Sequence, residues 1–141
     1  MKPHKDSEAR RWLMQASNDL RDARGAAEKL ASHALACYLS QQAAEKALKA
    51  LLLALGNEPW GHSVKLLLDE VAALTGVPAE VADAAGLDAY YIPTRYPNGL
   101  PGGVADDVYG ERDSALTIGM AEVVVGFVAA ALDSLQGEAE P

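Results

Sequence analysis

The chain has 141 residues and a formal net charge of −8, half of its residues are apolar, and its one cysteine is Cys37. This length and composition are typical of one domain with one core. A single cysteine excludes an intrachain disulfide and a cysteine-rich metal site. The negative charge excludes bulk electrostatic attraction as the means of binding nucleic acid.

Charge and apolar residues are unevenly distributed along the chain. Residues 1–49 carry a net charge of +3 and residues 50–141 one of −11, so an RNA ligand would need a local basic patch from the first two helices. The N-terminus lacks the apolar run of a signal peptide. The most apolar stretch, 123–132, is shorter than the roughly 20 residues that span a bilayer. We therefore expect a cytoplasmic protein without membrane contact.

A first helix is predicted from Ser7 to about Leu30. Ser7 can cap this helix, because its hydroxyl accepts hydrogen bonds from the free amides of the first turn. Apolar residues recur at three- and four-residue steps, the pattern of one buried helix face: Leu13, Ala16, Leu20, Ala23, Ala27 and Leu30. Asp19, Asp22 and Arg24 fall outside this stripe, so we expect them to face solvent.

A second helix is predicted from Ser32 to Leu55, where Gly56 and Asn57 end it. One face carries small residues that let a neighbouring helix approach closely: Ala36, Ser40, Ala43, Ala47, Ala50 and Ala54. Another face carries large residues that fill the core: Tyr38, Leu48, Leu52 and Leu55. A helix with two buried faces is central in its bundle, so Glu45 within it should be hydrogen-bonded.

Three further helices are predicted at 63–74, 78–89 and 112–135. The predicted inward residues of the third helix are Val64, Leu67, Leu68 and Val71. The apolar stripe of the last helix consists of Leu116, Met120, Val123, Phe127 and Ala131, and Val124 and Val128 widen this stripe. Pro78 fits the first turn of the fourth helix. The segment between the last two helices, 90–110, is rich in proline and glycine and irregular, and loops of this length are usually functional or disordered.

No strand pattern competes with these helices. The fold class is therefore all-α, an up-and-down bundle of four to five helices. We expect one domain over residues 1–141, with an ordered core at 6–136 and frayed ends. The glycine-rich half of the long loop, 99–107, is expected to be mobile.

Three segments carry a family resemblance. The second helix contains Gln41-Gln42-Ala43-Ala44-Glu45-Lys46-Ala47-Leu48-Lys49-Ala50, the next helix opens with His62, and the loop reads Tyr90-Tyr91-Ile92-Pro93-Thr94-Arg95-Tyr96-Pro97. In this order and spacing they resemble the HEPN domain family of prokaryotes, from about Leu13 to about Leu132.

The resemblance implies a helical bundle that dimerises and is often encoded beside a minimal nucleotidyltransferase, as toxin and antitoxin. It also implies a metal-independent ribonuclease motif, an arginine followed four to six residues later by a histidine. Arg95 matches the arginine, but no histidine occurs after His62. A histidine is suited to deprotonate the RNA 2′-hydroxyl, so this departure argues against catalysis. We expect no cofactor or metal, because no His/Asp/Glu set has ligand spacing.

Five residues are candidates for a nucleotide- or partner-binding site: Arg95, Tyr96, Tyr91, His62 and Lys46. Arg95 can bind a phosphate, or it can pair with a carboxylate such as Glu45 and hold the loop. The tyrosines can stack on a base or cover the end of the bundle. His62 can replace the missing base if it lies near Arg95, or it can cap its helix. Lys46 can line a groove for an anion, or lie on a solvated face.

These alternatives give three hypotheses. The first is a dimeric binding module that acts with a nucleotidyltransferase and holds a nucleotide, RNA or a partner at Arg95. The second is a ribonuclease toxin that uses Arg95 with an unconventional base. The third is a purely structural dimer, for which replacing Arg95 changes stability or assembly but no ligand binding.

Overall fold

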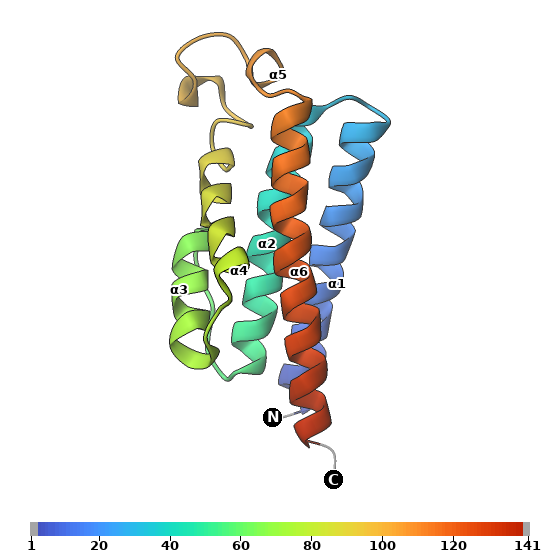
Figure 1. Ribbon diagram of the computed structural model, residues 1–141, viewed down its shortest axis with the longest axis vertical. Helices are drawn as coiled ribbons and strands as arrows, with labels where there is room; N and C mark the ends of the chain where they lie inside the picture. Colours follow the sequence, from blue (N-terminus) through green and yellow to red (C-terminus); the bar gives the residue numbers. More distant parts are fainter. Residues whose placement is uncertain (1–2, 140–141) are drawn as a thin grey trace.

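The computed structural model describes the backbone of residues 3–139 and the side chains of residues 6–137. Three long helices form the centre of a bundle: α1 (Pro3–Glu28), α2 (His33–Ala54) and α6 (Glu111–Ala139). α1 runs antiparallel to α2, whereas α6 runs in the same direction as α2 (Figure 1). No strand occurs within 3–139, and the predicted all-α bundle is confirmed.

Shorter elements cover one side and one end of the three long helices (Figure 1). They are α3 (Val64–Thr75), α4 (Ala79–Ala82), the 3₁₀ helix η1 (Asp83–Tyr90), the 3₁₀ turn η2 (Pro97–Gly99) and α5 (Ala105–Val108). The predicted fourth helix is thus α-helical for one turn and then continues as a 3₁₀ helix. The connector between α2 and α3 runs back along α2, and this path carries His62 to the middle of that helix (Figure 1).

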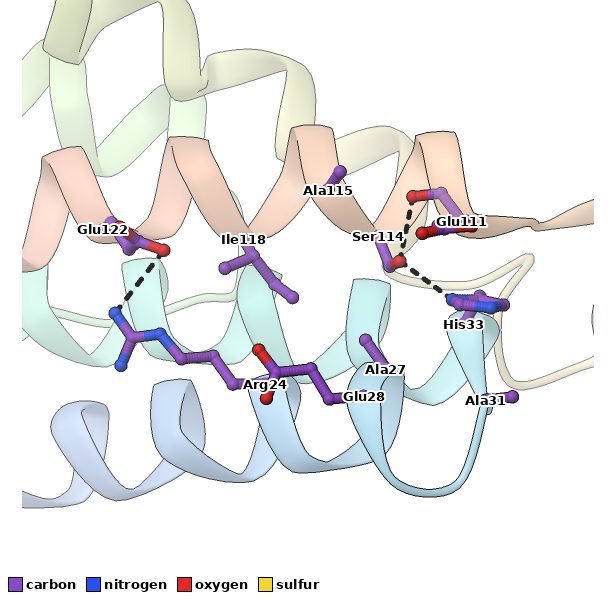
Figure 2. Close-up of a pocket in the computed structure, with 10 residues that line it drawn as sticks. All are labelled: Arg24, Ala27, Glu28, Ala31, His33, Glu111, Ser114, Ala115, Ile118 and Glu122. Atoms are coloured by element: carbon purple, nitrogen blue, oxygen red, sulfur yellow. Dashed lines mark hydrogen bonds and ion pairs between the residues drawn. The ribbon is translucent and has the colours of Figure 1, made fainter.

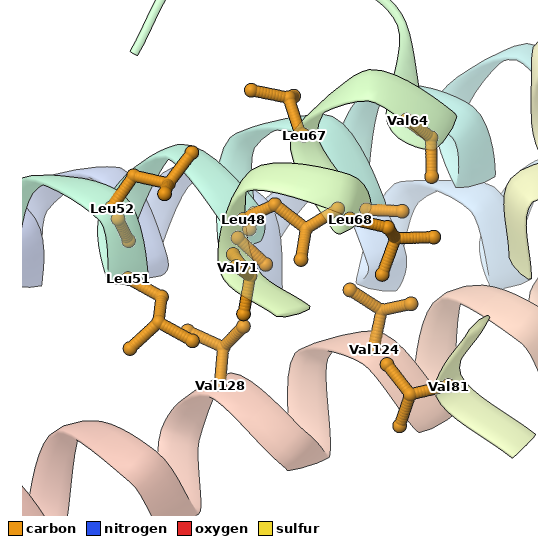
Figure 3. Packing of buried hydrophobic residues seen from close by; sticks show 14 of the residues in the cluster. Leu48, Leu51, Leu52, Val64, Leu67, Leu68, Val71, Val81, Val124 and Val128 are labelled. Atoms are coloured by element: carbon orange, nitrogen blue, oxygen red, sulfur yellow. The ribbon is translucent and has the colours of Figure 1, made fainter. Parts of the chain in front are cut away.

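The core consists mainly of leucine and valine side chains from α2, α3 and α6 (Figure 3). The predicted inward residues of α3 are all buried: Val64, Leu67, Leu68 and Val71. The small residues predicted to line α2 are buried too, as are four alanines of α1: Ala9, Ala16, Ala23 and Ala26. Small side chains on both helices allow α1 and α2 to pack closely along their length.

The structure differs from the predictions at both ends and on one face of α1. Among the described residues the helix begins at Pro3, since proline is tolerated in a first turn. Ser7 therefore lies inside the helix and does not cap it. Asp19 is buried rather than solvent-exposed, and Lys46 Nζ donates to its carboxylate at 2.6 Å. The lysine on α2 supplies the partner that a buried carboxylate needs. Leu30 lies beyond the end of α1 and is exposed.

The buried face of α6 is rotated relative to the predicted stripe. Leu116 is exposed, whereas Val124 and Val128, expected only to widen the stripe, are fully buried. The helix continues past its predicted end at 135 to Ala139. The predicted fraying of the C-terminus stays a prediction, and residues 140–141 lie outside the described residues. Among the described helices, α6 alone is long and apolar enough to cross a membrane by length and composition. Core helices pass the same test, and α6 packs against α2 and α1.

Candidate functional site

One face of α2 carries a stripe of polar and aromatic residues at three- and four-residue steps: Tyr38, Gln41, Gln42, Glu45 and Lys49. Glu45 is 3% exposed and Lys49 is buried beside it. Lys49 Nζ donates to Glu45 Oε2 at 3.2 Å, so the two buried charges are paired. The sequence-based expectation that Glu45 is hydrogen-bonded is therefore confirmed.

His62 is held against this stripe at two points. Its Nδ1 lies 3.3 Å from Glu45 Oε1, and its backbone carbonyl accepts a hydrogen bond of 2.9 Å from Gln41 Nε2. Because a carboxylate only accepts, Nδ1 carries the shared proton, and Nε2 is the acceptor in the neutral ring. The His62 side chain is 63% exposed, so it connects the buried Glu45 to the surface.

Tyr91 stacks on His62, and Arg95 packs on Tyr91. The His62 and Tyr91 ring centroids are 5.3 Å apart with an interplanar angle of 18°. The chain forms a turn over residues 92–95, in which the Arg95 amide donates to the Ile92 carbonyl at 3.0 Å. This turn brings Arg95 back to Tyr91. Arg95 Nε then donates to the Tyr91 carbonyl, also at 3.0 Å. These contacts bring the predicted residues Tyr91, Arg95 and His62 together.

The Arg95 guanidinium lies among three tyrosine rings. Its Cζ atom is 4.5 Å from the Tyr91 centroid and 4.9 Å from those of Tyr38 and Tyr96, within range of cation–π attraction. Among the side chains of residues 6–137, no carboxylate forms an ion pair with Arg95. The alternative in which Arg95 pairs with Glu45 is wrong, because Lys49 and His62 occupy that carboxylate.

A cavity of about 300 Å³ opens beside Arg95. Three parts of the chain line it: the start of α2, residues 94–97 (the Arg95 loop) and residues 104–106 at the start of α5. The lining residues are Ser32, Ala34, Leu35, Tyr38, Thr94, Arg95, Tyr96, Pro97, Val104, Ala105 and Asp106. The Ser32 side chain makes no capping hydrogen bond to α2. Because Ser32 and Ala34 line the cavity, the positive end of the α2 dipole lies there, where it favours negatively charged groups.

Comparison with known proteins identifies the family. Residues 9–131 match the HEPN domain family. The chain belongs to the HEPN domain family. Among curated proteins, none matches it.

Three solved structures share the fold. TT1696 from Thermus thermophilus is 43% identical, with a TM-score of 0.82, covering 86% of this chain and 96% of that one. ST0689, an archaeal HEPN homologue, is 38% identical, with a TM-score of 0.74 and coverages of 88% and 97%. A HEPN domain protein from Thermotoga maritima, TM0613, is 28% identical, with a TM-score of 0.57 and coverages of 92% and 98%.

The side chains of Tyr38, His62, Tyr91, Arg95 and Tyr96 form one cluster, called the Arg95 cluster below. Lys46 of this HEPN domain lies apart from it. It pairs with Asp19 and lines a different cavity, of about 470 Å³, on α1 with Glu8, Arg11, Trp12 and Gln15. The structure thus brings together four of the five predicted residues and leaves Lys46 out. Sequence reasoning did not assign Tyr38 to the site, although its spacing to Glu45 and Lys49 marks one face of a helix.

A third cavity, of about 560 Å³, lies between α1 and α6 of the HEPN domain and holds none of the predicted residues (Figure 2). Arg24 pairs with Glu122 at 3.4 Å on one side. On the other side, His33 Nδ1 lies 2.9 Å from Ser114 Oγ, and this hydroxyl donates to the Glu111 carbonyl. Most of its polar groups therefore bind one another across the helices, which favours a structural role.

Two further tyrosines near the site, Tyr90 and Tyr109, are half-buried. Tyr90 packs against Tyr109 with a centroid separation of 5.6 Å. Burial raises the pKa of both phenols, and the charge of Asp113 raises each further. Burial likewise raises the pKa of the nearby Cys37 thiol to about 11. These groups remain neutral at physiological pH, so we assign them to packing of the bundle.

Proposed function

We propose that this HEPN domain binds a nucleotide or single-stranded RNA by a phosphate group at Arg95. The observation that carries the proposal is the state of the Arg95 guanidinium. Arg95 is an exposed residue, three tyrosine rings surround its guanidinium, and Nε alone of the guanidinium nitrogens makes a hydrogen bond to the described residues. The terminal nitrogens can then form the paired hydrogen bonds that suit a phosphate.

The surroundings of Arg95 favour the same ligand class. Tyr96 is half exposed and offers a ring on which a base can stack, at about 1–3 kcal/mol per base. The dipole of α2 favours an anion in the adjacent cavity. Because the whole chain is acidic, binding depends on these local groups, and we expect it to weaken as salt is added.

Calorimetric titration with nucleoside monophosphates and short single-stranded RNA tests this proposal. We expect Arg95→Ala to weaken binding by about tenfold or more, the effect of one lost charge-assisted interaction. Arg21→Ala is the matched control, because Arg21 is exposed and, among the described residues, bonds only its neighbour Asp22. Equal binding by wild type and Arg95→Ala, with only stability or mass altered, would instead support the purely structural hypothesis.

A second candidate function is RNA cleavage with His62 as the base. Glu45 orients the His62 ring, and both His62 and Arg95 contact Tyr91. A carboxylate that holds Nδ1–H leaves Nε2 to accept a proton from the 2′-hydroxyl. Cleavage in the presence of chelator that is lost in both His62→Ala and Arg95→Ala would support this function. RNA binding without cleavage over a pH series would exclude it.

We also propose that the chain forms a homodimer through the exposed face of α6. The exposed residues of this face are small or apolar: Ala115, Leu116, Gly119, Gly126 and Ala130. A Cβ atom added to Gly119 or Gly126 would meet nothing within 4 Å, so packing inside one chain does not require these glycines. Glycine within a helix is destabilising by roughly 0.5–1 kcal/mol relative to alanine. Close approach of a second α6 would explain why glycine occupies these positions despite that cost.

Association with a nucleotidyltransferase and a cytoplasmic location stay predictions.

A further inference from the structure

Large apolar side chains surround the cavity beside Arg95 without being covered. Leu35 is 41% exposed, Tyr96 50% and Val104 54%. They come from α2, the Arg95 loop and the segment before α5, so three separate parts of the chain present apolar surface to one space. A flat, largely apolar group bound there would remove this surface from water.

The cavity has opposite charges in its lining, Arg95 and Asp106. Asp106 forms no ion pair or hydrogen bond with the described side chains, whereas its neighbour Asp107 accepts a hydrogen bond from the Val104 amide at 3.1 Å. An ionised carboxylate can only accept hydrogen bonds. A ligand that suits both residues therefore carries an anionic group, a flat ring and N–H donors on that ring.

We propose that this cavity binds the base of a guanine nucleotide, with Asp106 accepting from the base; the inference rests on the proposed binding of phosphate at Arg95. Guanine presents two adjacent donors, N1–H and the 2-amino group, which match the two oxygens of a carboxylate. Adenine places an acceptor, N1, beside its amino group, and that acceptor is repelled by a carboxylate. The cavity volume of about 300 Å³ is at the small end for ligand sites, which favours one nucleotide over a longer strand.

Gly103 contributes the local geometry that presents Asp106. Its φ of +67° lies in the left-handed region, which glycine adopts without steric cost. The chain turns there and enters α5, whose first turn carries Asp106 and Asp107. The Asp107 carboxylate accepts a hydrogen bond from the Val104 amide and fixes the turn. Asp106 is therefore the carboxylate that remains available to accept from a ligand.

Calorimetric titrations with guanosine, inosine and adenosine monophosphates test the assignment. Wild type should bind the guanosine compound about tenfold or more tightly than the adenosine compound, because a site that pairs with N–H groups rejects analogues lacking them. The inosine compound lacks the 2-amino group and should bind with intermediate affinity. Asp106→Asn should reduce the guanosine preference to about threefold or less and leave adenosine affinity at least as high, which also shows that the variant is folded. Asp83→Asn is the control, because Asp83 is exposed and forms no ion pair among the described residues.

The outcomes separate the two proposals. A wild type that binds all three nucleotides equally, or a guanosine preference that persists in Asp106→Asn, overturns the guanine assignment while phosphate binding at Arg95 stands. A wild type that binds none of the three overturns both. Equal losses in Asp106→Asn and Asp83→Asn would show a general charge effect and would also overturn the role of Asp106.

Discussion

Arg95 and His62 both pack against Tyr91, and Glu45 holds His62 from inside the bundle. The three segments that carried the family resemblance therefore meet at His62, which contacts Glu45 of the α2 segment and Tyr91 of the loop. Spacing along the sequence indicated that Glu45 needs partners. It could not identify His62 as one of them, because that contact depends on the path of the connector after α2.

Asp19 shows where residue-scale prediction fails. A carboxylate one position off an apolar stripe is expected in solvent, yet Asp19 is buried against Lys46. The burial of Asp19 depends on Lys46 of the neighbouring helix α2. The residue pattern of α1 alone carries no information about that lysine. The same pairing removes Lys46 from the candidate site.

Glu45→Gln should destabilise the fold by about 3 kcal/mol, because it leaves the buried Lys49 ammonium without its counter-charge. Urea unfolding measures this. Asp69→Asn is the matched control, since it breaks the exposed Lys65–Asp69 pair and should cost less than about 1 kcal/mol. Adding Lys49→Met to Glu45→Gln should restore much of the loss, and a double variant as unstable as the sum of the singles would contradict the pairing.

Stability should fall as the pH rises above 9. The Cys37 thiol has its pKa raised by burial to about 11 from an ordinary value of 9.0. Between these values the unfolded thiol loses its proton while the folded one keeps it, so the unfolded state is favoured progressively. Thermal melts from pH 8 to 11 measure the fall, and Cys37→Ala should show a shallower one. An identical pH dependence in both proteins would contradict the role of burial.

At the scale of elements, periodicity predicted the helices well and their local rotation less well. The small residues of α2 and the inward residues of α3 are buried as expected, because each stripe has one consistent spacing. α6 is apolar on several sides, so its sequence does not specify which side faces the core. The start of η1 was also beyond prediction, because α- and 3₁₀-helical turns of the same residues differ little in pattern.

Ala47→Leu should destabilise the bundle by about 1–3 kcal/mol, because a larger side chain is forced into a fully buried position on α2. Ala72→Leu, at an exposed position of α3, is the control and should change stability by less than about 0.5 kcal/mol. Chemical denaturation of both variants measures the difference. Equal stabilities would show that α2 is less closely packed than the structure indicates.

For the whole molecule, the proposed dimer contact is the exposed face of α6 that carries Gly119 and Gly126. Gly126→Leu should yield a protein with the mass of one chain, whereas wild type should have the mass of two, because leucine prevents close approach of a second helix. The same substitution improves helix propensity by roughly 1 kcal/mol, so loss of the dimer cannot be attributed to a weakened helix. Light scattering over a wide concentration range measures the masses, and a single-chain mass for wild type at every concentration would contradict the dimer.

The central claim is that the Arg95 cluster binds the ligand, and that the cavities lined by Lys46 and by Arg24 do not. Nuclear magnetic resonance titration of ¹⁵N-labelled protein with guanosine monophosphate tests it most directly. We predict shifts of the Arg95 side-chain Nε–H signal and of the amides of Tyr38, Tyr91 and Tyr96, with little change near Lys46 or at the Arg24–Glu122 pair. Shifts confined to the cavity between α1 and α6, or to the surroundings of Lys46, would contradict the assignment of the site.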